Sequence, residues 1–187
     1  MVFFLQMVGL FAALVVLMSL IEHQVHSRLM HKKPKLSLFR SSPARQKIFT
    51  QHAVVHHRQY FKAFHDAPVP HGEDRGIRLN LREGLMESLP VSLVLVFFST
   101  PAAIMFPVVV CLHHLMWNQI HLEMHKPEDR FFAKWPFYKL LARHHYLHHR
   151  HPDKNFNVAL PVGDLIFGTL AKADEADRQG MIAEGIA

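Results

Sequence analysis

Hydrophobic and polar positions follow one another in long blocks along this chain of 187 residues. Residues 1–21 carry no charged side chain, residues 84–117 carry only Glu87, and the other segments are polar and basic. A helix needs about 20 consecutive apolar residues to span a bilayer core. The block pattern therefore predicts an all-α integral membrane protein, because a soluble protein would spread its apolar residues more evenly.

The first apolar block, residues 1–21, is expected to be a retained transmembrane helix. A secretory signal peptide would begin with basic residues and end at a small-residue cleavage site. This block contains no Lys or Arg, and histidines follow it in place of small residues.

The second apolar block, residues 84–117, is longer than a single span requires. Pro101, preceded by Ser99 and Thr100, interrupts it near the middle. Proline inside a helix removes a hydrogen bond and breaks or kinks the helix. We expect two arms of about 16 residues, each about 24 Å long, joined into a membrane hairpin. The hairpin crosses the bilayer or re-enters it, and either form returns the chain to its starting face.

These blocks predict one membrane domain over residues 1–170. Its polar segments, residues 22–83 and 118–170, would share one face, and their basic residues make that face cytoplasmic. The expected membrane is a bacterial inner membrane or the endoplasmic reticulum membrane. We also expect a long helix over Gln46–His65 and a solvated tail over residues 171–187.

The charge and cysteine content narrow the possible functions. In a soluble protein, a net charge of +6 would suggest binding to nucleic acid. No nucleic-acid-binding motif is present, and anionic lipid headgroups explain the charge more simply. A single cysteine, Cys111, excludes an intrachain disulfide and a cysteine-based zinc or iron–sulfur site. The chain contains 17 histidines, so imidazole nitrogen is the candidate metal ligand.

Ten of the histidines fall into four boxes with metal-ligand spacing. One box follows the first apolar block, one lies in the basic segment, one follows the second apolar block, and one lies in residues 144–151. The boxes are His26 and His31; His52, His56 and His57; His121 and His125; and His145, His148 and His149. Four boxes on one expected face indicate a functional metal centre rather than scattered surface histidines.

The spacings within the boxes predict two metal ions. On an α-helix, His52 and His56 form an i,i+4 pair whose rings can reach one ion, and the third box has the same spacing. His26 and His31, five apart, would point about 140° apart, and adjacent histidines diverge by about 100°. Two neighbouring ions with about five ligands each would collect all ten and keep an open position, as catalysis requires. All-imidazole ligation suits zinc, copper, iron or nickel and does not choose among them.

The remaining histidines are expected to be solvated, at His65 and His71, or to have supporting or incidental roles, at His23, His113, His114, His144 and His151. His144 also competes with His145 as the first ligand of the last box, because it lies four residues before His148.

The order of the boxes, with an apolar block between the second and third, resembles the fatty acid hydroxylase / sterol desaturase superfamily. That family's boxes are written HxxxH or HxxxxH, then HxxHH or HxxxHH, then a His pair after a membrane hairpin, then HxxHH. The later segments 153–157 and 163–169 are similar to the family's Asn-aromatic-Gly element and its Asp-x-x-Phe-Gly-Thr ending. Asn157 stands where the family often has Gly. The resemblance covers about residues 22–170.

This resemblance implies a membrane-bound, non-haem di-iron enzyme that uses O2 to hydroxylate a C–H bond of a fatty acyl chain, a sterol or a related lipid. Zinc can replace the iron on purification. The implied iron ligands are the ten box histidines, with no catalytic residue beyond them, and Asp164 would be a structural residue near the site. Electrons would come from a separate donor of the ferredoxin or cytochrome b5 type.

Two alternatives stay open beside hydroxylation. A lipid desaturase begins with the same hydrogen abstraction. A non-enzymatic metal transporter or binder should place its ligands within the spans, near the midplane, whereas these boxes lie outside the apolar blocks. For an enzyme, we expect a substrate route between the first helix and the hairpin, near Leu95, Phe97, Phe98, Leu115 and Met116, residues that equally suit plain lipid contact.

Overall fold

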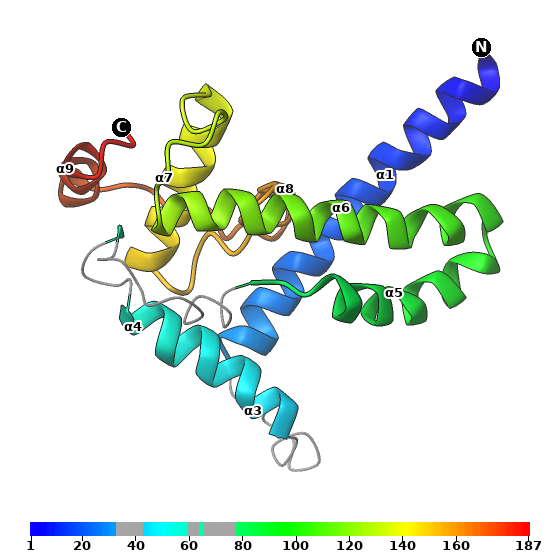
Figure 1. Ribbon diagram of the computed structural model, residues 1–187, viewed down its shortest axis with the longest axis horizontal. Coiled ribbons are helices and arrows are strands. Elements are labelled where there is room, and N and C mark those ends of the chain that lie inside the picture. The colour runs from blue at the N-terminus through cyan, green and yellow to red at the C-terminus, as the bar shows by residue number, and fades with distance from the viewer. Residues whose placement is uncertain (33–42, 60–63, 66–77) are drawn as a thin grey trace.

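The computed structural model describes residues 1–32, 43–59, 64–65 and 78–187, and all regular secondary structure in these ranges is helical (Figure 1). The all-α prediction is therefore confirmed for the described residues. With η marking π-helical segments, the elements are α1 (Val2–Val25), η1 (His26–Met30), α3 (Pro43–Phe49), η2 (Thr50–His56), α4 (His57–Gln59), α5 (Leu81–Val96), α6 (Thr100–His125), α7 (Pro136–Arg150), α8 (Val162–Phe167) and α9 (Glu175–Ala183).

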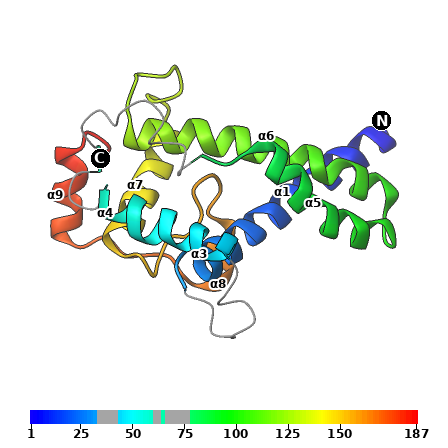
Figure 2. The same cartoon turned by 60° about the horizontal axis from the view of Figure 1, so that its bottom comes forward.

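The molecule has two ends of different character (Figure 1, Figure 2). The amino terminus of α1 and the turn of the α5–α6 hairpin lie toward one end. Helices α3, α7 and α9 gather toward the other end, where the carboxyl end of α6 also arrives. The elements that carry histidine boxes therefore meet at the end away from the hairpin turn.

Helix α1 packs against α6 along its second half and is exposed along its first. Leu14 and Met18 of α1 share a buried apolar cluster with Phe106 and Val109 of α6, whereas Phe3 is largely exposed. Within the described residues, two helical stretches are long and apolar enough to cross a membrane: Val2–Met30 and Thr100–His125.

Helices α5 and α6 form a hairpin whose turn, residues 97–99, lies where the sequence analysis expects it. Asn80 caps α5 by accepting from Arg82 N, and Ser99 caps α6 by accepting from Ala102 N. Proline is favoured at the first positions of a helix, and Pro101 begins α6 in this way. Helix α6 runs beyond residue 117 to His125, so the third histidine box lies on the hairpin arm itself.

The helix expected over Gln46–His65 has different limits. It begins at Pro43. Proline is favoured there because the backbone N–H that it lacks would have no partner within the first turn of the helix. It is helical through Gln59, with a π-helical segment in its middle, and His65 lies in a bend. Residues 60–63 lie outside the described residues, as does His71.

The segment over residues 171–187, expected to be a solvated or frayed tail, is largely exposed but forms a helix that packs on α7. Helix α9 begins with a capping box in which Asp174 and Asp177 each accept from the other's backbone N–H. Met181 and Ile186 are buried in a core with Leu141 and Tyr146 of α7. Gly180 permits close packing of α9 on α7, since a Cβ at this position would clash with the Tyr146 hydroxyl.

Candidate metal centre

The histidine boxes converge on two adjacent, buried sets of ring nitrogens. In each set one ring nitrogen per histidine lies within 4.8 Å of all the others. The outer histidine group consists of His26, His31, His52, His57 and His148. The inner histidine group consists of His56, His125, His145 and His149.

The tenth predicted ligand, His121, lies beside the inner histidine group. It is fully buried, and its ring centroid is 4.7 Å from those of His125 and His145. On its other side the ring packs on Trp117, with 4.1 Å between centroids. The structure thus brings together all ten box histidines, nine within the two sets and His121 in ring contact with the inner one.

Two π-helical segments form most of the outer histidine group. The His31 backbone N–H donates to the His26 carbonyl at 3.2 Å, an i→i+5 bond, and the His57 N–H donates to the His52 carbonyl. A π turn brings residues five apart close to one face. The prediction that His26 and His31 diverge by about 140° is therefore wrong, because it assumes α-helical geometry.

The inner histidine group uses ordinary α-helical spacing. His145 and His149 lie one turn apart on α7, and their ring centroids are 4.7 Å apart. The box that contains His52 and His56 is divided differently from the i,i+4 pairing that its spacing suggested. His52 joins the outer group with His57, and His56 joins the inner group.

Two of the boxes contain a pair of adjacent histidines, and each of these pairs contributes one residue to the outer group and one to the inner group. His57 and His148 belong to the outer group, and their neighbours His56 and His149 belong to the inner group. Adjacent residues on a helix diverge by about 100°, so one helix can face two sites at once. The rings of His57 and His149 stack with 4.5 Å between centroids, which shows how closely the two groups lie.

The nitrogen–nitrogen distances fit metal coordination. His31 Nε2 lies 3.2 Å from His26 Nε2 and 3.1 Å from His148 Nε2 in the outer group. In the inner group, His145 Nε2 lies 3.1 Å from His125 Nε2 and 3.2 Å from His149 Nε2. With metal–nitrogen bonds of about 2.1 Å, ligands at right angles would lie about 3.0 Å apart and tetrahedral ligands about 3.4 Å apart. The donor atoms of each group are therefore close enough together to hold one metal ion.

Backbone carbonyls orient three of the candidate ligands. His148 Nδ1 donates to the Lys154 carbonyl at 2.6 Å, His125 Nδ1 donates to the Phe64 carbonyl at 3.0 Å, and His26 Nδ1 donates to the Phe156 carbonyl. A proton held on Nδ1 leaves the Nε2 lone pair free to bind a metal, and such bonds fix the ring orientation.

Burial keeps the outer ligands neutral at physiological pH. Burial lowers the pKa of His31 to about 4 and that of His57 to about 2, and burial together with the nearby His31 lowers the pKa of His148 to about 3. The charged form is disfavoured where water is excluded. Neutral imidazole is the form that ligates a metal.

Asp164 connects the segment after α7 to the site. Its buried carboxylate accepts from the backbone N–H groups of Phe156 and Asn157 at 2.8 and 2.7 Å, and from His144 Nε2 at 3.0 Å. Since the Phe156 carbonyl accepts from His26, this carboxylate helps to hold an outer ligand in place. His144 is thus a partner of Asp164, and neither group includes it.

A second buried carboxylate, Glu22, fastens the same segment to α1. It accepts from the Val158 backbone N–H at 2.9 Å and from Asn157 Nδ2 at 3.0 Å, and His113 Nε2 lies 3.3 Å from it. Gly163 allows this close approach, because a Cβ there would lie 2.6 Å from Asn157 Oδ1. The Asn157 side chain thus joins this segment to α1, and the φ of Asn157 is not positive.

The other histidines hold structural contacts outside the two groups. His23 Nε2 lies 2.9 Å from Thr169 Oγ1, His114 Nδ1 donates to the Val110 carbonyl, and His151 Nε2 donates to Asp177. His65 Nδ1 lies 2.9 Å from Glu184 Oε2, so it is paired rather than simply solvated.

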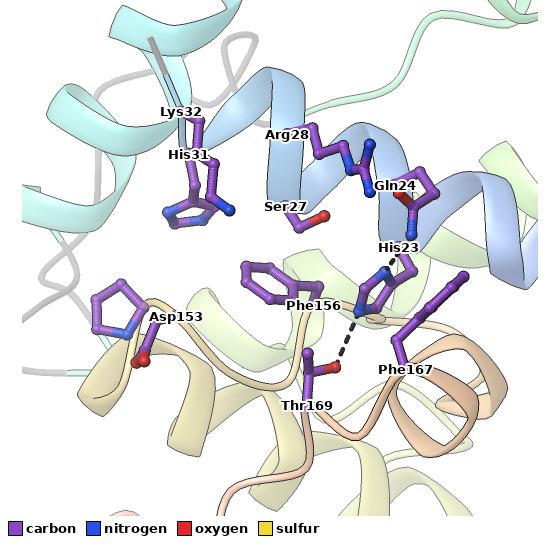
Figure 3. A pocket seen from close by; sticks show the side chains of 11 residues that line it. His23, Gln24, Ser27, Arg28, His31, Lys32, Asp153, Phe156, Phe167 and Thr169 are labelled. Carbon is purple, nitrogen blue, oxygen red and sulfur yellow. Dashed lines mark hydrogen bonds between the residues drawn. The ribbon is translucent and has the colours of Figure 1, made fainter.

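A pocket of about 540 Å³ reaches the outer histidine group from the surface (Figure 3). His31 and Phe156 line it, and the Phe156 ring contacts the rings of His26, His31 and His148. It lies between α1–η1 and the segments that follow α7 and α8, away from the route expected near the hairpin. On that expected route Phe97, Phe98, Leu115 and Met116 are exposed, and Leu95 packs against the α1–α6 cluster.

Sequence reasoning missed the roles of Glu22 and Asn157 and the pocket itself. One signal could have pointed to Glu22: it is a carboxylate at the end of an apolar run, and such a charge needs a partner. A scan against protein-family models, a search of curated proteins and a search of solved structures each found no match to this chain. The functional interpretation therefore rests on the residues and geometry above.

Proposed function

We propose that this protein is an integral-membrane di-iron enzyme that uses dioxygen to hydroxylate a fatty acyl chain, a sterol or a related lipid. The observation that carries the proposal is the convergence of nine box histidines on two adjacent sites with ligand-like spacing, with the tenth, His121, in ring contact with the inner one. The similarity of the four boxes to the fatty acid hydroxylase / sterol desaturase superfamily supplies the identity of the metal and the reaction.

In this proposal α1 and α6 cross the bilayer, and the histidine-bearing end of the molecule lies on the cytoplasmic face. The length and apolar character of Val2–Met30 and Thr100–His125 support the two crossings. The excess of basic residues in segment 22–83 supports the orientation. A lipid substrate would then reach the centre without leaving the membrane surface.

The outer histidine group would hold one iron, and the inner histidine group with His121 would hold the other. When bound, the iron pair supplies the oxygen activation that breaks an unactivated C–H bond, and the protein supplies orientation and access. A separate protein of the ferredoxin or cytochrome b5 type would deliver the electrons.

The protein's own contribution is rigidity around the ligands and exclusion of water. His56, His125, His145 and His149 are nearly inaccessible to solvent. Carbonyls of Phe64, Lys154 and Phe156 set the tautomers of three ligands. Preorganised ligands need no rearrangement when the reaction begins, which is the main way a protein scaffold assists such chemistry.

The arrangement favours an enzyme over a metal transporter. A transporter would bind its ion midway along the spans, between discontinuous helices. Here the outer ligands His26 and His31 follow the 24 residues of α1, and His121 and His125 end α6. A desaturase would use the same ligands, and the products distinguish the two reactions.

The test is lipid analysis of cells that express the wild-type protein, grown with and without oxygen. We expect a lipid heavier by one oxygen atom, formed only in oxygen and absent with His148→Ala/His149→Ala, which removes one ligand from each group. His65→Ala is the matched control and should keep most of the activity. An oxidised lipid formed equally by the double variant would contradict the proposal, and a lipid lighter by two hydrogens would identify a desaturase.

A further inference from the structure

The pocket beside the outer histidine group has a charged mouth. Arg28 and Lys32 are exposed at its rim, and among the described residues Asp153 is the only carboxylate that lines it (Figure 3). Neither cation forms an ion pair with any residue that the structure describes. Unpaired guanidinium and ammonium groups at a pocket mouth attract an oxyanion, and Arg binds carboxylate and phosphate through two parallel hydrogen bonds.

The interior of the same pocket is aromatic. Phe156 lines the pocket, and its ring contacts those of His26 and His148 at centroid distances of 5.8 and 5.7 Å. Phe167 forms another wall and stacks on the His23 ring at 4.7 Å. Such walls suit the hydrocarbon part of a ligand.

An exposed apolar surface continues outward from Phe167. Leu165 and Ile166, on the same short helix α8, are 67% and 57% exposed. Large side chains exposed together beside a pocket mark a contact with an apolar partner. An apolar chain could therefore leave the pocket along α8 without entering water.

The position along α1 places this pocket at the membrane surface. The uncharged run of α1 ends at Ile21, and Arg28 and Lys32 follow within the next few turns. In a helix that crosses the bilayer, cations just beyond the apolar run lie at the depth of the lipid headgroups. The charged mouth is thus where the headgroup of a membrane lipid would be.

We propose that this pocket binds an anionic amphiphile, with its oxyanion headgroup on Arg28 and Lys32 and its apolar part along Phe156, Phe167 and α8. The proposal rests on the proposed function, because it names the substrate class of the same centre: a lipid that carries a carboxylate or a phosphate. A neutral sterol would leave both cations unused. His31 lies in the pocket wall, so the bound lipid directly adjoins the outer histidine group.

The experiment measures binding of radiolabelled laurate to the full-length protein in neutral detergent, by scintillation proximity. The variant is Arg28→Gln/Lys32→Gln, and Lys134→Gln/Lys139→Gln is the control with the same loss of charge at a distant surface. Dodecanol, acetate, inorganic phosphate and dodecyl phosphate serve as competitors. Metal content is measured on the same samples.

We expect Arg28→Gln/Lys32→Gln to raise the Kd for laurate by about tenfold or more, since each hydrogen bond to a charged group is worth about a tenfold change. The control variant should bind laurate like the wild type. Dodecanol and acetate should compete at least tenfold more weakly than laurate. Stronger competition by dodecyl phosphate than by unlabelled laurate would identify a phosphate headgroup, and the reverse would identify a carboxylate.

Three results would overturn the proposal: equal affinity in the wild type and Arg28→Gln/Lys32→Gln, equal losses in the variant and its control, or equal competition by dodecanol. Equal competition by inorganic phosphate would also overturn it, because the pocket would then bind a free ion. The metal measurement separates the two proposals. Laurate binding without bound metal would defeat the proposed function alone, and bound metal with no selective laurate binding would defeat this inference alone.

Discussion

The outer and inner histidine groups use the same side chain but different helix geometry. Pairs five residues apart on π-helical segments, His26 with His31 and His52 with His57, supply four of the five members of the outer group. A pair four residues apart on α7, His145 with His149, contributes to the inner group. π-helical turns are rare and occur mostly at functional sites, so the outer group uses the less stable backbone.

The two groups also differ in access. His125 and His145 have no exposed surface, whereas His31 is only partly buried and lines the pocket. A metal site that keeps an open position needs a path for the incoming molecule. The inner group is therefore closed to the surface, and the outer group is the one that a molecule in the pocket could reach.

Removal of ligands from one group at a time is expected to have the largest effect. His31→Ala/His52→Ala should halve the metal content and abolish activity, because the ion nearest the pocket is lost. His125→Ala/His145→Ala should also cost one ion, with a larger loss of stability because buried side chains leave cavities. Metal analysis and thermal unfolding of the purified variants provide the measurement.

Free imidazole sharpens this comparison. It should restore metal to His31→Ala, where the pocket gives access, and fail to do so with His145→Ala. Equal rescue of both variants would remove the distinction between an open and a closed group.

A change of Asp164 should have an intermediate effect. Asp164→Asn weakens the acceptor for the Phe156 and Asn157 N–H groups and thereby loosens the carbonyl that orients His26. We expect metal affinity to fall about 10-fold to 100-fold, as for other partners that orient metal ligands. Competition with a chelator measures this, and Asp129→Asn, at an exposed position away from the pocket, is the control. Unchanged affinity in Asp164→Asn would remove its proposed role in positioning.

Metal removal should loosen the π-helical turns of the outer group more than helix α7, which carries ligands of the inner group. Chelation should speed hydrogen exchange about tenfold or more at the amides of His31 and His57, whose i→i+5 bonds lie in the ligand-bearing turns. The amide of His145, which lies inside the packed helix α7, should change less. Mass spectrometry of peptides with and without chelator gives the comparison, and uniform changes across both groups would contradict it.

The contribution of a single histidine to acid sensitivity should be the smallest of these effects, and it is visible in the metal-free protein. An unfolded histidine titrates near pH 6.5, while burial holds the pKa of His31 at about 4. Between those values the unfolded chain binds a proton that the folded protein does not. The free energy of unfolding should therefore fall as pH drops from about 6.5 to about 4, by up to about 1.4 kcal/mol per pH unit for each such histidine.

Unfolding in detergent, followed by circular dichroism after chelation, measures this dependence. His31→Gln is the control and should show a shallower slope in the same range. A free energy of unfolding that does not change between pH 7 and pH 4.5 would contradict the prediction, because the histidines would then bind protons equally in the folded and unfolded states.

The sequence predicts the parts of this structure that depend on local patterns. The long apolar blocks predict α1 and the hairpin, and the turn falls next to Pro101, because composition and proline placement act locally. The clustering of ten histidines and the need for two sites follow from spacing and from the divergence of adjacent residues such as His148 and His149.

The sequence does not predict features that depend on long-range contacts or on rare backbone geometry. Nothing in the spacing of His52, His56 and His57 indicates a π-helical segment, so their division between the groups is visible only in the fold. Glu22 and Asp177 stabilise segments more than 20 residues away in the chain, through contacts that no local pattern records. The packing of the chain end onto α7 was missed for the same reason.

Metal content of the detergent-purified protein tests the central claim most directly. The account predicts about two metal ions per wild-type chain, with iron supporting turnover, and their loss in His148→Ala/His149→Ala. Each of these residues belongs to a different group, so the double variant affects both sites at once. A folded wild-type protein with no stoichiometric metal, or a double variant that keeps both ions, would contradict the account.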